Sequence, residues 1–326
     1  MRRLLVVCGA VAAALLPAGC GDDGVRGAPT SRAGAADCPP LAPLRIDARV
    51  RVGRGVGPLA IADGRLWAAR PAAGVLASVR IGARPRAGQP IRVGAPVSIA
   101  AAFGGVWVAD RDGGRILRVD PATGAVARWA DVEAPVKIVV AGAGLFAISL
   151  DDGALYAINP RGPGKGLEIG IPTRGPVDAV QQGGDLWVLG GADSGLSPLE
   201  LRTSVFRRAG VRLPTRVVGT IAAGQGAVWA ALPTARAVAR VDPVFLSLGA
   251  VYASRGFRPT VVAVDSCTVW LGDADGRVTR IDARRARPVG RPLRIGRSLA
   301  ALVVDRGGVW ASDPRAGTVV RVAARR

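Results

Sequence analysis

Apolar and polar residues alternate along short segments of the chain, and turn sequences separate these segments. In the segment GGVWVAD, Val106 and Val108 fall on one face of an extended chain, while Trp107 and Ala109 fall on the other. The turn sequences RDGG and DPATG follow, with a second alternating segment between them. The period of two predicts short β-strands joined by hairpins.

One aromatic residue recurs in this pattern at intervals of 39 to 42 residues, flanked each time by small and branched residues. The seven copies are Trp67, Trp107, Phe146, Trp187, Trp229, Trp270 and Trp310. A bulky residue between small neighbours on a strand is well placed to pack between adjacent repeat units. We therefore interpret the aromatic residue as core rather than as a ligand-stacking group.

Four-stranded units repeating about every forty residues predict an all-β fold, a seven-bladed β-propeller. The last unit stops after its third strand, and the segment from Ile46 to Val52 resembles the outer strands of other units. We expect this N-terminal strand to complete the seventh blade and close the ring. An open solenoid would not need such a strand.

The acidic turns DRDGG, DDG and DADG have two possible interpretations. A calcium loop needs more oxygen ligands at fixed spacing and a final bidentate Glu. Asp and Gly also favour the left-handed backbone of hairpin turns. We interpret these aspartates as turn formers.

The formal net charge of +20 changes the picture little. Nearly all the cations are Arg, since Lys occurs only at 137 and 165, and they are spread along the whole chain. No run of five or more basic residues marks a nucleic-acid-binding arm. We expect a diffusely basic surface without a specific nucleic-acid partner, and keep a selected anionic partner as the alternative.

The N-terminus, MRRLLVVCGAVAAALLPAGC, is typical of an export signal, with two arginines before an apolar run too short to span a bilayer. Its end resembles a bacterial lipobox, which implies a diacylated Cys20, although Pro17 stands where the lipobox usually has Leu. We predict a signal peptide at 1–19, a flexible tether at 20–37 and the propeller at 38–326. A secretory signal that is simply cleaved is the alternative.

Two cysteines, Cys38 and Cys267, remain once the signal is removed and Cys20 carries lipid. An even pair in an oxidising compartment predicts a disulfide. Two separate buried thiols are the alternative.

The VWVADRDGGRILRVDPATG pattern, repeated over 46–326, resembles the bacterial YVTN/NHL-type and streptogramin-lyase-like propellers. The resemblance implies the fold, but propellers of this kind include binding modules, scaffolds and enzymes. Streptogramin lyases, by this resemblance, use a histidine base with a bound magnesium ion, and this chain contains no histidine. Serine–histidine hydrolysis and histidine-ligated metal sites are excluded on the same ground.

Propeller lactonases of the gluconolactonase type, by resemblance, bind calcium at the channel mouth through acidic and amide side chains. Counting nine residues back from each aromatic gives the innermost strand of six units; the first unit is one residue short there and is not placed. These positions hold Ser98, Lys137, Asp178, Thr220, Val261 and Ala301. Only one is a carboxylate, and we expect Lys137 to pair with Asp178. We therefore predict no metal and no cofactor.

The mouth of the ring is the candidate ligand-binding surface, because loops from all units converge there. Its polar candidates are Lys137, Asp178, Ser98 and Thr220, with QQGGD (181–185) and RGF (255–257) as neighbouring loops. A water-filled channel with a structural ion pair is the alternative.

From these features we expect a non-catalytic binding or scaffolding lipoprotein, monomeric and anchored by lipid to the outer face of a bacterial cytoplasmic membrane. Its partner would be a protein or an anionic envelope polymer. Two alternatives stay open. One is a hydrolase or lyase that uses carboxylate or metal chemistry at the mouth, and the other is a sensor for a small extracellular ligand.

Overall fold

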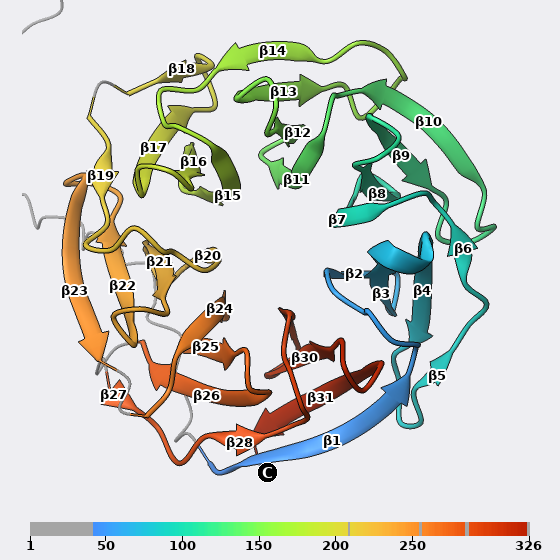
Figure 1. Ribbon diagram of the computed structural model, residues 1–326, viewed down its shortest axis with the longest axis vertical. Helices are drawn as coiled ribbons and strands as arrows, with labels where there is room; N and C mark the ends of the chain where they lie inside the picture. Colours follow the sequence, from blue (N-terminus) through green and yellow to red (C-terminus); the bar gives the residue numbers. More distant parts are fainter. Residues whose placement is uncertain (1–41, 208, 254–255, 284–286, 325–326) are drawn as a thin grey trace, which may run out of the picture. The chain divides into compact units, whose positions relative to one another are not determined.

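The computed structural model describes residues 42–207, 209–253, 256–283 and 287–324. In this part of the chain seven antiparallel sheets stand around a common axis (Figure 1). One short 3₁₀ turn, η1 (Pro71–Ala73), interrupts the strands of the described part. No helix in these ranges has the length and hydropathy needed to cross a membrane. The predicted all-β, seven-bladed propeller is confirmed.

Each blade begins with an inner strand beside the axis and continues with a second strand that carries the recurring aromatic residue (Figure 1). The inner strands are β2 (Leu59–Ala62), β7 (Pro96–Ala102), β11 (Pro135–Ala141), β15 (Pro176–Gln182), β20 (Ile221–Gly224), β24 (Pro259–Val264) and β29 (Ala301–Asp305). The second strands are β3 (Arg65–Arg70), β8 (Gly105–Asp110), β12 (Gly144–Ser149), β16 (Asp185–Gly190), β21 (Ala227–Leu232), β25 (Thr268–Asp273) and β30 (Gly308–Asp313).

Third and outer strands complete the blades. The third strands are β4 (Val75–Arg80), β9 (Arg115–Val119), β13 (Ala154–Ile158), β17 (Gly195–Glu200), β22 (Ala237–Asp242), β26 (Arg277–Asp282) and β31 (Thr318–Ala324). The outer strands are β5 (Arg86–Ala87) with β6 (Ile91–Arg92), β10 (Val126–Asp131), β14 (Leu167–Gly170), β18 (Val205–Phe206) with β19 (Val211–Arg212), β23 (Ser247–Ala253), β27 (Arg287–Pro288) with β28 (Leu293–Arg294), and β1 (Leu44–Arg51).

The outer strands of the first, fourth and sixth blades are each split into two short pieces, where the sequence predicts one strand. Both pieces still pair with the third strand of their blade. In the fourth blade the break faces Pro198, whose ring nitrogen has no hydrogen to donate to a neighbouring strand. Pro90 and Gly290 lie at the breaks of the first and sixth blades.

The seventh blade combines the two ends of the described chain, as predicted. β1 pairs antiparallel with β31 from Leu44 opposite Ala324 to Arg51 opposite Thr318 (Figure 1). A salt bridge adds to this pairing, since Arg321 Nη1 lies 2.6 Å from Asp47 Oδ2. The chain ends thus close the ring and leave no open edge between the first and last blades.

The recurring aromatic residues form the core between blades, which confirms their interpretation as packing residues. All seven expose 8% of their surface or less. Trp107 and Ala109 pack in one cluster with residues of the third blade, while Val106 and Val108 pack in another with Trp67 of the first blade. The two faces predicted from the alternation therefore contact the two neighbouring blades.

The acidic turns form as predicted. Gly114, Gly153 and Gly276 adopt positive φ angles of 57°, 61° and 79° in the turns RDGG, DDG and DADG. In the turn DPATG, one carboxylate oxygen of Asp120 accepts the main-chain N–H groups of residues 122 and 123. These hydrogen bonds lower the pKa of Asp120 from its ordinary value.

Several predictions from the sequence lie outside the described residues. These are the signal peptide at 1–19, the lipidated Cys20, the tether at 20–37 and Cys38. The half-buried Cys267 directly precedes β25. The disulfide between Cys38 and Cys267 therefore stays a prediction.

Candidate functional site

Four inner strands place a side chain at the mouth of the ring by the same local irregularity. Each begins with proline, and the pairing with the second strand shifts register between the proline and the residue two positions later. An extra residue at such a bulge bends the strand and redirects the side chain that follows. The side chains after the shift are Ser98, Lys137, Asp178 and Val261.

A channel of about 600 Å³ runs between the inner strands. All six positions predicted from the nine-residue offset line this channel. The seventh position, which the sequence does not place, belongs to Pro58: its carbonyl accepts the N–H of Ala69, and it also lines the channel. Which of these residues bind a ligand stays a prediction.

Ser98 and Thr220 connect neighbouring blades across the channel wall. The hydroxyl oxygen of Ser98 accepts the main-chain N–H of Ile138 in the next blade, at 3.1 Å. Thr220 Oγ1 accepts the N–H of Val262 in the next blade, at 2.9 Å. Buried main-chain N–H groups need a partner, so these two hydroxyls stabilise the junctions between blades.

Asp178 makes the same kind of connection and a second one. Its Oδ2 accepts the N–H of Ile221 in the next blade at 3.0 Å, and its Oδ1 accepts the N–H of Ala179 at 2.9 Å. Lys137 Nζ lies 2.5 Å from Oδ1, which confirms the predicted ion pair. The Asp178 side chain is 8% exposed and that of Lys137 is 31% exposed, so the pair sits at the channel wall with the amine nearer solvent.

The chemistry of Lys137 explains why a carboxylate follows it in the ring. Lys137 occupies the position that Ser98 and Thr220 occupy in their blades, but an ammonium group has no acceptor to offer the next blade. The carboxylate at Asp178 supplies that acceptor and neutralises the amine as well. We refer to these four residues, Ser98, Lys137, Asp178 and Thr220, as the inner-ring polar residues.

The remaining channel wall is aliphatic, and sequence reasoning missed this. Val97, Val136 and Val177 follow the prolines of three inner strands and line the channel, and Val177 exposes 41% of its surface. The signal was present as the repeated sequences PVS, PVK and PVD. The channel therefore combines an apolar wall with a lysine amine whose remaining N–H groups can donate to a ligand.

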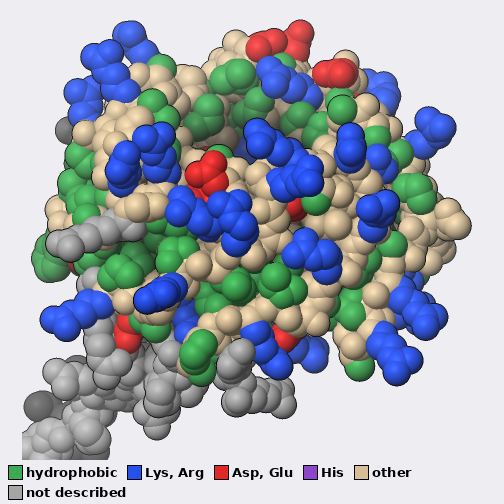
Figure 2. Space-filling view, turned by 60° about the horizontal axis from the view of Figure 1, so that its bottom comes forward, with side chains coloured by type: hydrophobic (Ala, Val, Ile, Leu, Met, Phe, Trp, Pro, Cys, Tyr) green, Lys and Arg blue, Asp and Glu red, His purple; other side chains and the backbone are tan. Residues whose placement is uncertain are grey.

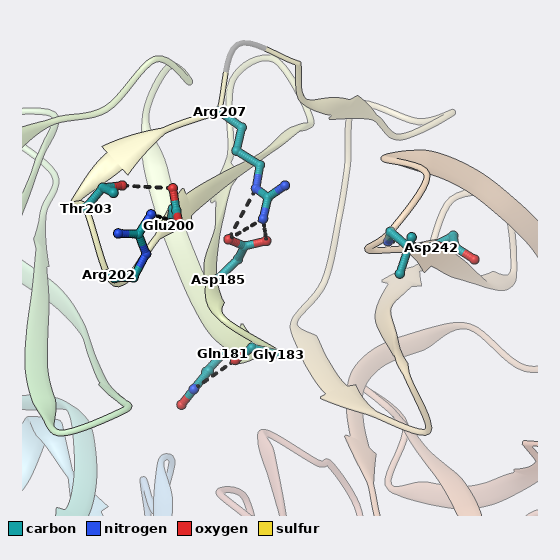
Figure 3. Close-up of polar contacts among 9 residues, drawn as sticks. Gln181, Gly183, Asp185, Glu200, Arg202, Thr203, Arg207 and Asp242 are labelled. Atoms are coloured by element: carbon teal, nitrogen blue, oxygen red, sulfur yellow. Dashed lines mark hydrogen bonds and ion pairs between the residues drawn. The ribbon is translucent and has the colours of Figure 1, made fainter. Parts of the chain in front are cut away.

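The two neighbouring loops predicted to add contacts lie elsewhere. Gln181 is near the end of β15 away from Asp178; its amide accepts the N–H of Gly142 and donates to the carbonyl of Gly183 (Figure 3). Phe257 of the RGF segment is buried in the core with Trp229. Gln181 and Phe257 therefore support the blades rather than the channel mouth.

Buried carboxylates also hold the turns that follow several second strands. Asp110 accepts the main-chain N–H of Ala95 at 2.8 Å and pairs with Arg115, whose Nε lies 2.8 Å from Oδ2. Asp273 pairs in the same way with Arg277, at 2.6 Å. Within the described residues no three side chains of His, Cys, Asp or Glu are grouped so that they could share a metal ion.

No protein-family model matches the chain. No curated protein matches its sequence either. Known structures with a similar fold do exist. Three of them share 12 to 14% sequence identity with this chain.

Virginiamycin B lyase from Staphylococcus aureus aligns over 87% of this chain and 100% of its own, with a TM-score of 0.73 and 12% identity. A catalytically inactive histidine-to-alanine variant of that lyase, with quinupristin, gives the same TM-score at 13% identity. A streptogramin B lyase aligns over 87% of this chain and 98% of its own, with a TM-score of 0.71 and 14% identity. At these identities the likeness concerns the backbone alone. This chain, which has no histidine, has the propeller fold found in the streptogramin B lyases.

Proposed function

We propose that this chain is a non-catalytic, lipid-anchored binding module of the bacterial cell envelope, which takes its ligand or partner at the mouth of the propeller channel. Cys20 carries the lipid in this proposal, and the segment 20–37 tethers the ring to the outer face of the cytoplasmic membrane. The inner-ring polar residues connect neighbouring blades at the mouth by hydrogen bonds and one ion pair.

One observation supports this proposal most strongly. The oxygens of Asp178, the single carboxylate of the inner ring, accept two main-chain N–H groups and the amine of Lys137. A general base needs a lone pair within hydrogen-bonding reach of the proton that it removes. A carboxylate engaged in this way suits a structural connection, while the aliphatic wall and the lysine amine suit binding without turnover.

Site-specific photo-crosslinking in intact cells tests where binding occurs. A photoreactive amino acid at Val177 points the probe at the channel, because Val177 lines it and is 41% exposed. The matched control is Val205 on the outer strand β18 of the same blade, which is 61% exposed. We expect a distinct adduct from position 177 and not from position 205. The same adducts from both positions, or an adduct from 205 alone, would contradict channel binding.

A turnover screen tests the absence of catalysis. The full-length protein is incubated with a panel of esters and lactones, with and without calcium and magnesium ions, and we expect no rate above that of buffer. A rate that disappears in Lys137→Met, while the circular dichroism spectrum is unchanged, would assign a hydrolase or lyase activity to the mouth instead.

Membrane fractionation tests the anchor separately. We expect the protein in the membrane fraction, Cys20→Ala in the soluble fraction, and a diacylglyceryl group on the N-terminal peptide by mass spectrometry. An unmodified, soluble wild-type protein would exclude the anchor and leave the channel experiment unaffected.

A further inference from the structure

Four arginines line one pocket of about 410 Å³ where the seventh blade meets the first: Arg51, Arg54, Arg297 and Arg315. All four are exposed. Figure 2 shows the side of the ring with β1 and β28 turned forward, where blue Lys and Arg side chains are scattered over the face and outnumber the red Asp and Glu side chains. Within the described ranges, none of the four forms a salt bridge with a carboxylate.

The backbone that carries three of these arginines is fixed by the closure of the ring. Arg51 is the last residue of β1 and pairs with β31. Beyond it, the N–H of Gly53 donates to the carbonyl of Gly317 at 3.0 Å. A Cβ at Gly317 would lie 2.6 Å from the backbone of the facing loop, so the two segments are in close contact. The loop of Arg54 is thereby held against the turn of Arg315.

A buried carboxylate places the fourth arginine against the same turn. Asp313 accepts the main-chain N–H groups of Arg297 at 2.8 Å and Ala316 at 3.0 Å, and the hydroxyl of Ser298 at 2.8 Å. The same Ser298 oxygen accepts the N–H of Arg315. Asp313 therefore positions the backbones of two arginines, and no carboxylate of the described residues forms a salt bridge with their guanidinium groups.

The corresponding carboxylate of the second blade has a different partner. Asp110 has the place of Asp313, and its cross-strand partner Arg115 neutralises it. In the seventh blade the cross-strand partner of Asp313 is the uncharged Thr318. The buried carboxylate of the seventh blade therefore has no cross-strand cation, and it is held by uncharged donors instead.

We propose that this arginine pocket binds an anion that carries two linked phosphate groups. Guanidinium groups donate pairs of N–H bonds that match phosphate oxygens, and several exposed cations gathered at one pocket attract an anion. A cavity of this size lies within the range of small-ligand sites, with room for more than one phosphate group. This inference concerns a different surface from the channel and does not depend on the lipid anchor.

Calorimetric titration of the full-length protein in detergent with inorganic pyrophosphate, at low salt, tests the proposal. We expect saturable binding of one pyrophosphate per chain and a rise in the thermal midpoint. Arg297→Gln with Arg315→Gln should weaken binding about tenfold or more, because each removes a charged hydrogen-bond donor. The control, Arg84→Gln with Arg86→Gln, removes the same charge from the exposed edge around β5 and should leave the affinity within about twofold.

Two further measurements keep the proposal falsifiable. Arg54→Gln serves as a second variant if the double variant does not fold, and it should also weaken pyrophosphate binding. Cardiolipin vesicles test a lipid source of the phosphates, because this headgroup joins two phosphate groups through glycerol. The Cys20→Ala protein is used here, so that a lipid anchor does not itself carry the protein to the vesicles. Cosedimentation that is lost when Arg297→Gln and Arg315→Gln are added supports the pocket with a headgroup as ligand. Equal losses in pocket and control variants, or no saturable binding to either probe, overturn the proposal.

Discussion

The carboxylate of Asp178 accepts a hydrogen bond from the main-chain N–H of Ile221 across the junction of the fourth and fifth blades, with 3.0 Å between Oδ2 and nitrogen. Ser98 and Thr220 make the equivalent bond at two other junctions. A serine, a threonine and an aspartate thus perform one structural task at one repeated position. At these three junctions the side chain is an acceptor for the next blade, and the negative charge of Asp178 also pairs with Lys137.

Replacing Asp178 with alanine should destabilise the ring. The change leaves the N–H groups of Ala179 and Ile221 without their acceptor, and an unsatisfied buried donor costs about 1–3 kcal/mol. We expect a loss of that order in the free energy of unfolding, measured by urea denaturation. Asp178→Ser is the matched control, because a serine does this task in the second blade, and it should recover part of the loss. Equal losses in both variants would refute the role of the acceptor.

Replacing Lys137 with methionine should have a much smaller effect. The amine is the more exposed partner of the ion pair, so solvent screens part of its attraction to the carboxylate. Asp178 keeps both of its main-chain donors in this variant. We therefore expect the urea midpoint of Lys137→Met to stay close to that of the wild type. A loss as large as that of Asp178→Ala would mean that the ion pair, rather than the main-chain bonds, holds the junction.

The sequence was sufficient to predict the fold because each unit repeats its own core. The spacing of the aromatic residues and the period of two depend on local packing, and the recurring tryptophans pack with residues of their own blade and of a neighbouring blade. The offset of nine residues also identified six of the residues that line the channel. It could not reveal their partners, since the bond from Asp178 to Ile221 spans 43 residues and depends on how neighbouring blades are staggered.

The arginine pocket was not predictable for a related reason. Arginine is common throughout the sequence, so no local excess marks Arg51 or Arg315. The pocket forms where ring closure brings together segments that are some 250 residues apart in the sequence. For example, the side chain of Arg49 donates a hydrogen bond to the carbonyl of Ile295, 246 residues away. Arginines that are spread evenly along the sequence are therefore brought together at one pocket by the closure of the ring.

Ring closure should be sensitive to a charge at Val50. This residue of β1 is buried in the cluster that also contains Trp310 and Leu66, so Val50→Asp places a carboxylate in the core between the last and first blades. We expect a loss of several kcal/mol or failure to fold, since an unpaired buried charge is costly. Ile46→Thr on the same strand is the control, because Ile46 is exposed, and it should unfold within about 0.5 kcal/mol of the wild type. Similar thermal midpoints for both variants would show that β1 does not close the core.

The predicted disulfide between Cys38 and Cys267 has a direct test. Peptide mapping of the mature protein without reduction should recover the two cysteines in one linked peptide pair. Cys38→Ser should then lower stability by about 2–4 kcal/mol, the usual contribution of a native disulfide. Free thiols at both positions would exclude the pairing.

The hydroxyl of Tyr156 should make stability fall in alkaline solution. Burial raises the pKa of Tyr156 above the ordinary value of a tyrosine, and a hydrogen bond donated to Asp152 Oδ2 at 2.8 Å raises it further. The folded state therefore retains the proton to higher pH than the unfolded state, and the stabilisation is fully present below about pH 10 and lost as the pH rises through the folded-state pKa.

We expect the wild type to unfold at higher urea concentration than Tyr156→Phe at pH 8, with the difference shrinking above pH 10. Tyr252→Phe, the other tyrosine of the chain, is the control. A constant difference between wild type and Tyr156→Phe from pH 8 to 11 would show that the Tyr156 proton is not linked to folding.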